Sequence, residues 1–401
     1  MADGVQDTEA AESAATRAPL RVRSGYFWFY AAIGAFTPFI SLYYRDLGMT
    51  GLQLGVLMAL PALWTAFTGS VLGAIADSMA IHRTMLRVVL VAAAVIAMIA
   101  TRPTKFAALL VLMSILAFSL VPVPALLDSY AVNVAERAGT SYGSLRVWGS
   151  IGYTVMVLVM GELLGDRVTS RFLFAYASCL LIAWVSVFGL PHLAERRPRP
   201  LLDGLQAVRT SKPFLLLLLV AYLLASGYAV ISSFLGIHIQ ELGGSTGQVG
   251  LAYALSAMTE FPILFFSGWI LTRFGSRRVL LVALCFYVVR FAILSFAPNP
   301  VWIIVAQLFH GLSFGAFLIA SVTLAHRLVG RDNAATAQAV LGTMSFGFGS
   351  ITGSLIAGAL LDQVSTYTIF RGITVLMIVT VIIFVAGSRI TGTEENEPVT
   401  A

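Results

Sequence analysis

The sequence predicts an all-α integral membrane protein with 12 transmembrane helices in two pseudo-symmetric six-helix bundles. Composition is the first observation behind this prediction. Of the 401 residues, 58% are hydrophobic and 11% are charged, whereas an average soluble domain has about 45–50% and about 25%. Such a chain has too little charge to cover a water-facing surface. The composition therefore excludes a soluble enzyme and a disordered chain. The second observation is an internal repeat.

Apolar stretches long enough to cross a hydrocarbon layer of about 30 Å recur along the whole chain. Several are rich in Gly, Ala and Ser, which allow helices to pack closely in lipid. We expect the membrane-spanning segments at 25–44, 52–76, 84–101, 106–135, 142–164, 171–190, 214–238, 247–271, 278–297, 301–328, 333–361 and 367–388.

The polar segments between these stretches define the domain organisation. The first residues lack the apolar core and cleavage site of a signal peptide, so we expect a disordered tail there. Most of the 25 Lys and Arg residues fall on the side that holds both termini. The positive-inside rule then predicts cytoplasmic termini in the inner (plasma) membrane, and it explains the net charge of +6 without nucleic acid. The predicted parts are a tail at 1–24, a bundle at 25–190, a linker at 191–213, a bundle at 214–388 and a tail at 389–401.

The internal repeat has a nearly constant offset. Asp46-Leu47-Gly48 follows the first predicted span, and Glu241-Leu242-Gly243 follows the seventh, 195 residues later. The loops that begin at Gly73 and Gly268 are also 195 residues apart. Two parallel repeats related by an axis along the membrane normal describe one large transporter fold. We therefore expect the two halves to be related by a pseudo-twofold rotation.

Both copies of the repeat carry a short loop with glycine and charged residues after their second span. These loops resemble the signature of the major facilitator superfamily, G-x-x-x-D-[RK]-x-G-R-[RK], and neither copy is complete. The resemblance implies a cytoplasmic gating latch, in which Asp77 caps a helix end or pairs with an Arg. The alternative is a short loop made basic by topology alone. The matching residues are Gly73, Asp77, Arg83, Gly268, Arg273, Gly275 and Arg277.

Five ionisable residues fall well inside predicted spans. A charge at mid-membrane costs at least about 2.5–3.5 kcal/mol, so these side chains should face a polar cavity or one another. Two belong to the first half and three to the second half. They are Asp128, Arg146, Glu260, Arg290 and His310.

Asp128 and Arg146 lie on neighbouring antiparallel spans, so an ion pair between them is possible. One interpretation is a substrate clamp, because Arg offers a planar fork of donors and Asp accepts hydroxyl groups. The other is a structural ion pair. Trp148 and Tyr153 share the span with Arg146, and Tyr153 lies two turns further along the same face. An aromatic ring in that place is a suitable platform for a sugar ring or an arene.

Glu260 is the only acid deep in a span of the second half. An acid whose surroundings differ between two conformations can take up and release a proton. Arg290 and His310 are the basic groups with which it could pair. The sequence does not decide which of the two is the partner of Glu260. The alternative is a permanently paired carboxylate without a role in proton coupling.

The run YGSLRVWGSIGY at 142–153, together with Asp128, is similar to the lactose-permease-like branch of the major facilitator superfamily. The resemblance implies that Asp128 and Arg146 hold a sugar and that Tyr153 stacks on it. It also implies that Glu260, Arg290 and His310 form the proton-coupling set. The stretches EFPILFFSGWILTRFGSRR and QLFHGLSFGAF look most like phenylpropionate-type and nucleoside-type proton symporters. The lactose carriers have a further acid one turn after the His. The corresponding residues here, Ser313, Phe314 and Gly315, are not acidic, so lactose itself is not the expected solute.

We therefore expect a monomeric secondary transporter that imports a small polar organic solute with protons by alternating access. Aromatic acids, nucleosides and sugars are the candidate solutes, and we expect no cofactor and no metal. The chain shows no nucleophile triad, metal-ligand spacing or phosphate loop, so an enzyme is not expected. A drug or metabolite efflux antiporter is the alternative, although the run GSIGYTVMVLVMGELLGD lacks the proline typical of such antiporters. A lipid-handling or receptor role on the same fold stays open.

Overall fold

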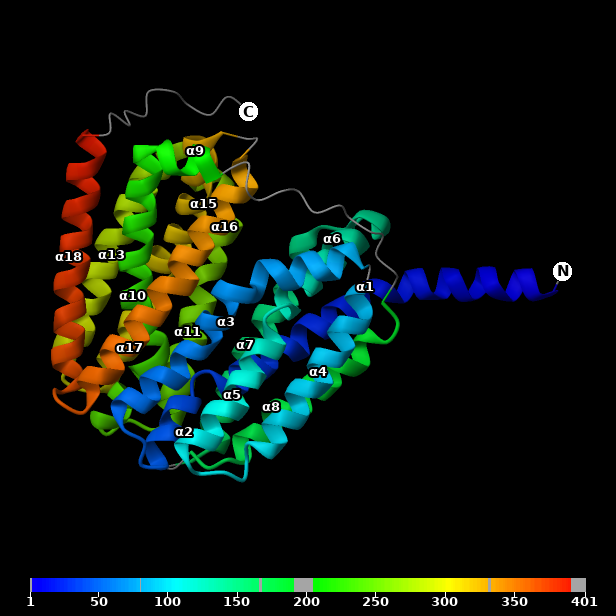
Figure 1. Cartoon of the computed structure of the whole chain (residues 1–401), viewed down its shortest axis with the longest axis horizontal. Helices are drawn as coiled ribbons and strands as arrows, with labels where there is room; N and C mark the ends of the chain where they lie inside the picture. The colour runs from blue at the N-terminus through cyan, green and yellow to red at the C-terminus, as the bar shows by residue number, and fades with distance from the viewer. Residues whose placement is uncertain (1, 80, 166–167, 191–204, 331–332, 391–401) are drawn as a thin grey trace. The chain divides into compact units, whose positions relative to one another are not determined.

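The computed structural model describes residues 2–79, 81–165, 168–190, 205–330 and 333–390. Every regular element in these ranges is a helix (Figure 1). The helices divide into two compact units. Unit 1 contains Met1–Leu47 and Phe67–Pro198, and unit 2 contains Gly48–Ala66 and Arg199–Ala401.

Unit 1 is built around the first helix. α1 packs against α6, α7 and α8, while α4 packs against α5 and α8. The chain bends between α1 and α2 at residues 37–39. The helices of unit 1 are α1 (Ala2–Phe36), α2 (Ile40–Asp46), the second half of α3 (Gly51–Ser78), α4 (His82–Ile99), α5 (Phe106–Leu120), α6 (Val123–Ala138), α7 (Tyr142–Leu163) and α8 (Arg171–Val187).

Glycines bring the backbones of α1 and α7 into contact. A Cβ atom at Gly152 would lie 2.1 Å from the backbone oxygen of Phe27, and one at Gly34 would lie 2.6 Å from the backbone oxygen of Tyr153. Helices approach this closely only where side chains are absent. The contact holds the α1 tyrosines beside the charged face of α7.

We expect Gly152→Ala to destabilise unit 1 by about 1–3 kcal/mol, because the added methyl group forces the α1 backbone away from α7. The measurement is the thermal unfolding midpoint in detergent. Gly143→Ala on the same helix is the matched control, since a Cβ at Gly143 meets nothing within 4 Å. An equal effect of the two substitutions would contradict the proposed backbone contact.

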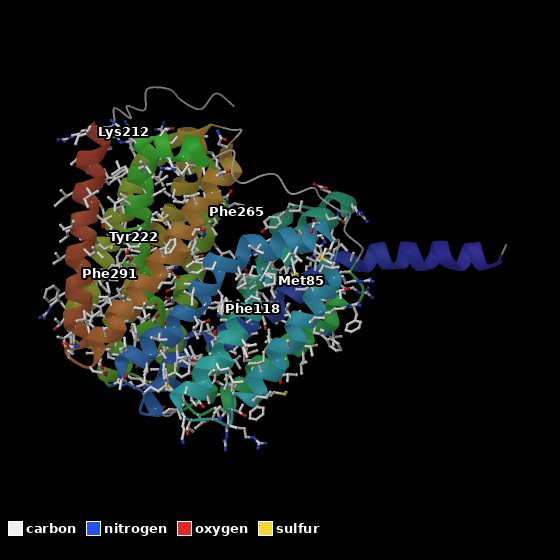
Figure 2. All side chains as sticks on the ribbon, in the orientation of Figure 1. Met85, Phe118, Lys212, Tyr222, Phe265 and Phe291 are labelled. Atoms are coloured by element: carbon white, nitrogen blue, oxygen red, sulfur yellow. The ribbon has the colours of Figure 1, made fainter. Side chains whose placement is uncertain are left out.

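Unit 2 is built around α10, which packs against α17, α18 and η3, while α13 packs against α15 and α18. Phe291, labelled in Figure 2, is wholly buried on α13, and its ring centroid lies 6.4 Å from that of Phe370 on α18. The helices are α9 (Leu205–Thr210), α10 (Lys212–Glu241), α11 (Thr246–Phe265), α12 (Ser267–Phe274), α13 (Ser276–Phe296), α14 (Pro300–Gln307), η1 (Gly311–Gly315), α15 (Ala316–Val329), α16 (Ala334–Gly342), η3 (Thr343–Gly349), α17 (Ser350–Leu361) and α18 (Thr366–Ile390).

The first half of α3 belongs to unit 2, whereas the sequence predicts all of this span in the N-terminal bundle. Small residues explain the difference. A Cβ at Gly55 would lie 2.6 Å from the backbone oxygen of Ser354, and one at Gly358 would lie 2.6 Å from the backbone oxygen of Gly51. Asp362 Oδ2 also accepts a hydrogen bond of 2.7 Å from the backbone nitrogen of Gly51, at the N-terminus of α3.

The predicted fold class is confirmed. In the described ranges, ten helices are long and apolar enough to cross a membrane, and α11 with α12, bent by 62°, forms a possible eleventh span. The predicted span at 171–190 corresponds to α8, which has only 17 residues. The two long spans predicted at 301–328 and 333–361 each contain a π-helical segment, η1 and η3 respectively.

The structure describes the N-terminal segment, whereas parts of the linker and of the C-terminal tail lie outside the described residues. α1 begins at Ala2, so the structure describes as helix the segment 2–24 that we expect to be a disordered tail. Ala and Glu recur in this segment and favour helix, whereas the expectation of disorder rests on its polarity. Of the predicted linker at 191–213, residues 191–204 lie outside the described residues, and Leu205–Thr210 form α9. Of the predicted tail at 389–401, residues 391–401 lie outside the described residues, and α18 ends at Ile390.

Candidate functional site

The predicted charge pair of the first half lies together in unit 1. Asp128 is on α6 and Arg146 is near the start of α7, where the side chain of Ser141 caps the helix by accepting from the backbone nitrogen of Ser144. Arg146 Nε is 3.9 Å from Asp128 Oδ1. The side chains are 32% and 44% exposed respectively, so neither is buried.

Three tyrosines surround this pair. Tyr26 on α1 and Tyr142 on α7 donate their hydroxyls to Asp128 Oδ1 at 2.5 and 2.9 Å. Arg146 Nη2 donates to the hydroxyl of Tyr30 at 2.9 Å, and Arg146 Cζ lies 4.3 Å from the centre of the Tyr30 ring. Hydrogen bonds that involve charged groups are stronger than neutral ones. The tyrosines therefore fix the orientation of both charged side chains.

This arrangement leaves donors and an acceptor of the pair without a described partner. Among the described residues, Asp128 Oδ2 and Arg146 Nη1 and Nε have no hydrogen-bond partner, because the hydrogen bonds above use Oδ1 and Nη2, and Nε is 3.9 Å from Oδ1. A carboxylate oxygen accepts a hydroxyl hydrogen, and a guanidinium nitrogen donates to a hydroxyl oxygen. The two charges cancel. The site is suited to a neutral ligand with neighbouring hydroxyl groups.

The two predicted aromatic residues also lie on α7. Trp148 is 38% exposed. Tyr153 is partly buried, and its backbone lies against Gly34 of α1. Sequence reasoning did not single out Tyr30 or Tyr142 as partners of the charge pair. Tyr142 precedes Arg146 by four residues, a helical spacing that places both on one face, and this spacing is a signal that sequence reasoning could have used.

The three ionisable residues of the second half form one chain in unit 2. His310 Nε2 lies 2.6 Å from Glu260 Oε1 on α11, and His310 Nδ1 lies 2.8 Å from Arg290 Nη1 on α13. Arg290 and His310 are 1% and 3% exposed, whereas the Glu260 side chain is 26% exposed. His310 therefore joins Glu260 to Arg290, so the histidine is the direct partner that the sequence left open.

The hydrogen atoms in this chain can be assigned from its geometry. A guanidinium only donates, so Nδ1 of His310 accepts from Arg290. The remaining ring nitrogen, Nε2, then carries the hydrogen and donates to Glu260. The chain is satisfied with a neutral imidazole between a positive and a negative group.

A buried glutamine also contacts Arg290. Arg290 Nη2 and Ser256 Oγ both donate to Gln307 Oε1, and the Gln307 amide donates to the backbone oxygen of Ile303 at 2.8 Å. Arg290 Nε, in contrast, is buried without a hydrogen-bond partner among the described residues. The i, i+3 spacing of Gln307 and His310 is visible in the sequence, whereas the contact with Arg290 is not.

A π-helical segment places the histidine. His310 immediately precedes η1, and such segments are frequent at functional sites. A Cβ at Gly311 would lie 1.9 Å from the backbone oxygen of Thr259, so only glycine allows α11 to approach here. The His310 ring stacks on Phe314 at 5.2 Å, and Tyr228 of α10 stacks on Phe314 at 4.7 Å. These rings form an aromatic face beside the Glu260 chain.

The predicted latch residues lie on or beside four helices, and no described contact assigns them a gating role. Arg83 Nη1 donates to the backbone oxygen of Leu190 at 3.4 Å. Gly275 has φ +77° between α12 and α13, a conformation that favours glycine. The side chain of Asp77 lies outside the described part of the chain. The remaining predicted residues are Gly73 on α3, Gly268 and Arg273 on α12, and Arg277 on α13.

Two helical units, each with a cluster of charged side chains among many apolar helices, are the architecture of a membrane transporter of the major facilitator type. The chain belongs to the MFS_1-like family, whose sequence model matches residues 20–372. It is 29% identical to a maltose permease of Geobacillus stearothermophilus over 380 residues, 92% of this chain and 95% of the permease.

Other relatives have different named solutes. The chain is 25% identical to an Escherichia coli protein described as a probable 3-phenylpropionic acid transporter, over 86% of this chain and 92% of that protein. It is 20% identical to the nucleoside permease NupG of Escherichia coli, over 80% and 82%. A crystal structure of a NupG variant matches with a TM-score of 0.85 at 18% identity, covering 92% of this chain and 99% of that one. This structural match shows the fold.

Proposed function

We propose that the protein is a proton-coupled symporter that imports a neutral solute carrying a sugar ring by alternating access. The observation that supports this most directly is the Asp128–Arg146 pair with its three tyrosines. Its unused acceptor and donor match two neighbouring hydroxyl groups of a sugar. We further propose that both termini are cytoplasmic, because Lys and Arg gather on that side of the plasma membrane. The proposed functional unit is a monomer.

The charge balance of the cluster favours a neutral solute over an aromatic acid. An anionic solute would gain from Arg146, but it would meet the Asp128 carboxylate less than 4 Å away. Like charges held that close repel strongly in a site of low dielectric constant. The named solutes of the maltose and nucleoside permeases both carry sugar rings, which agrees with this choice.

Glu260 is the proposed proton carrier. Glu260, His310 and Arg290 are linked by hydrogen bonds. Of these three side chains Glu260 is partly exposed, and His310 and Arg290 are buried. A proton can therefore reach Glu260 without entering the buried part of the chain. Protonation would remove the negative end of the chain and weaken its attraction to Arg290, and a carrier needs such a difference between two states.

The test of the solute class is counterflow in proteoliposomes that contain the purified protein. Radiolabelled maltose, glucose, uridine and phenylpropionate would each be offered to vesicles preloaded with the same unlabelled compound. We expect exchange of at least one sugar or nucleoside and none of phenylpropionate. Exchange of phenylpropionate alone would contradict the proposed neutral solute.

A further inference from the structure

Two buried donors on α13 have no hydrogen-bond partner among the described residues. They are the hydroxyl of Tyr287 and Nε of Arg290. Both residues are wholly buried, with 0% and 1% of their surface exposed. Their spacing of three residues places them on one face of the helix. Most buried polar groups in proteins are hydrogen-bonded, and an unpaired one carries the full cost of its desolvation. These two donors therefore indicate a ligand beside them.

A third donor comes from α10. The ring of Tyr228 stacks on the imidazole of His310 with their centroids 5.9 Å apart, and His310 Nδ1 lies 2.8 Å from Arg290 Nη1. The Tyr228 hydroxyl interacts electrostatically with both Tyr287 and Arg290. It makes no hydrogen bond within the part of the chain that the structure describes. Tyr228 is only partly buried, so it lies between the two buried donors and the surface of unit 2.

The backbones of α10 and α13 approach each other at this level. A Cβ at Gly227, the residue before Tyr228, would lie 3.5 Å from Cζ of Phe291 on α13. The Phe291 ring is stacked on that of Tyr287 with their centroids 6.2 Å apart. The three unused donors therefore gather in one small region of unit 2.

The charge of this region favours an anion as the ligand. The described hydrogen-bond partners of Arg290 are both neutral, His310 Nδ1 and Gln307 Oε1. The carboxylate of Glu260 reaches Arg290 only through the imidazole. A buried cation gains strongly from an anion in direct contact, because Coulomb attraction is large where water is excluded. Each of the unused groups can donate a hydrogen bond, and an anion accepts several of them.

We infer that Tyr287, Arg290 and Tyr228 form a binding site for one halide ion, chloride in ordinary salt solutions. The guanidinium supplies the positive charge through Nε, and the two tyrosine hydroxyls complete the ligand set. The burial of Tyr287 and Arg290 limits the size of the ion. A monatomic anion is suited to such a place, whereas an organic carboxylate would have to bring its carbon skeleton between packed helices.

A water molecule matches these groups less well than a halide. It could accept from two of the three donors, and its own two hydrogens would then need acceptors. The nearby acceptors are already in use, because Gln307 Oε1 accepts from Arg290 and Ser256, and His310 Nδ1 accepts from Arg290. The inference of a halide site does not rest on the proposed transport function.

The dependence of stability on chloride tests the inference. The purified protein would be unfolded with urea in detergent, in sodium chloride or in sodium gluconate at the same ionic strength. A ligand that binds only the folded state raises the folding equilibrium constant, by about tenfold at a concentration ten times its Kd. We expect a saturable rise with chloride and with bromide, and none with gluconate, which is too large for a buried site.

Tyr287→Phe removes one donor and keeps the ring. It should weaken chloride binding at least about tenfold, because a hydrogen bond to a charged group is lost. Tyr176→Phe is the matched control, at a tyrosine on α8 of unit 1 that is 2% exposed, and it should keep the wild-type response to chloride. The inference is overturned if Tyr287→Phe responds to chloride as the wild type does.

Glu260→Gln provides an independent arm. It removes the negative charge at the other end of the chain that leads through His310 to Arg290. The charge of Arg290 is then less compensated, so chloride should bind more tightly. An unchanged or weaker response to chloride in Glu260→Gln would contradict a site at Arg290. A wild-type protein that is equally stable in chloride, bromide and gluconate would also overturn the inference, and this is the result that an ordered water molecule predicts.

Discussion

Replacing Arg146 by lysine is expected to reduce solute uptake into proteoliposomes by about 10- to 100-fold. Arg146 makes a hydrogen bond to Tyr30 through Nη2 and directs Nε toward Asp128, and Nη1 is the proposed donor to the solute. A lysine ammonium is a compact point charge and cannot serve these three directions at once. The charge of the site is unchanged, so the loss would report on the geometry of the guanidinium fork.

The control for this substitution is Arg171→Lys, at an exposed arginine at the start of α8. We expect uptake by that variant to equal that of the wild type. Solute affinity should be measured beside the uptake rate, because the clamp interpretation requires weaker binding. Wild-type affinity in Arg146→Lys would show that the Asp128–Arg146 pair only holds two helices together.

Glu260→Gln is expected to abolish accumulation of solute driven by a pH gradient and to preserve exchange of solute across the membrane. The amide keeps the size of the side chain and can still accept from His310 Nε2, which lies 2.6 Å from Glu260 in the wild type. It cannot bind or release a proton. The two assays are pH-jump-driven uptake and counterflow, measured in the same vesicles.

Glu136→Gln, at an exposed acid on α6, is the control for Glu260→Gln and should leave both assays unchanged. Two other outcomes would change the assignment. If Glu260→Gln retained both activities, proton coupling would belong to another acid, with Asp128 the next candidate. If it lost both, Glu260 would be structural or would bind the solute directly.

Much of the fold could be predicted from the sequence because lipid imposes simple rules on length and hydropathy. Each predicted span corresponds to one helix or to two or three consecutive helical segments. The breaks within the predicted spans could not be predicted from the length of the apolar stretches. Gly311, the first residue of η1, is needed because a Cβ there would meet the Thr259 backbone on another helix. The first half of α3 groups with unit 2 because glycines on α3 and α17 bring the two backbones into contact. The length of an apolar stretch does not reveal such a contact.

The charged members of both clusters could be predicted, because a charge in an apolar span stands out against its surroundings. Their uncharged partners could not. Tyr30 and Gln307 are ordinary residues of membrane helices, and their roles depend on contacts with Arg146 and Arg290 on other helices.

The central claim is that solute and proton cross the membrane together, and a pH dye trapped inside proteoliposomes tests it most directly. Vesicles without an imposed pH gradient would receive the sugar or nucleoside identified by counterflow, added outside only. Solute entry down its gradient should carry protons inward and acidify the lumen, and Glu260→Gln vesicles should show no acidification. Solute entry at the wild-type rate without any change in lumenal pH would contradict proton symport.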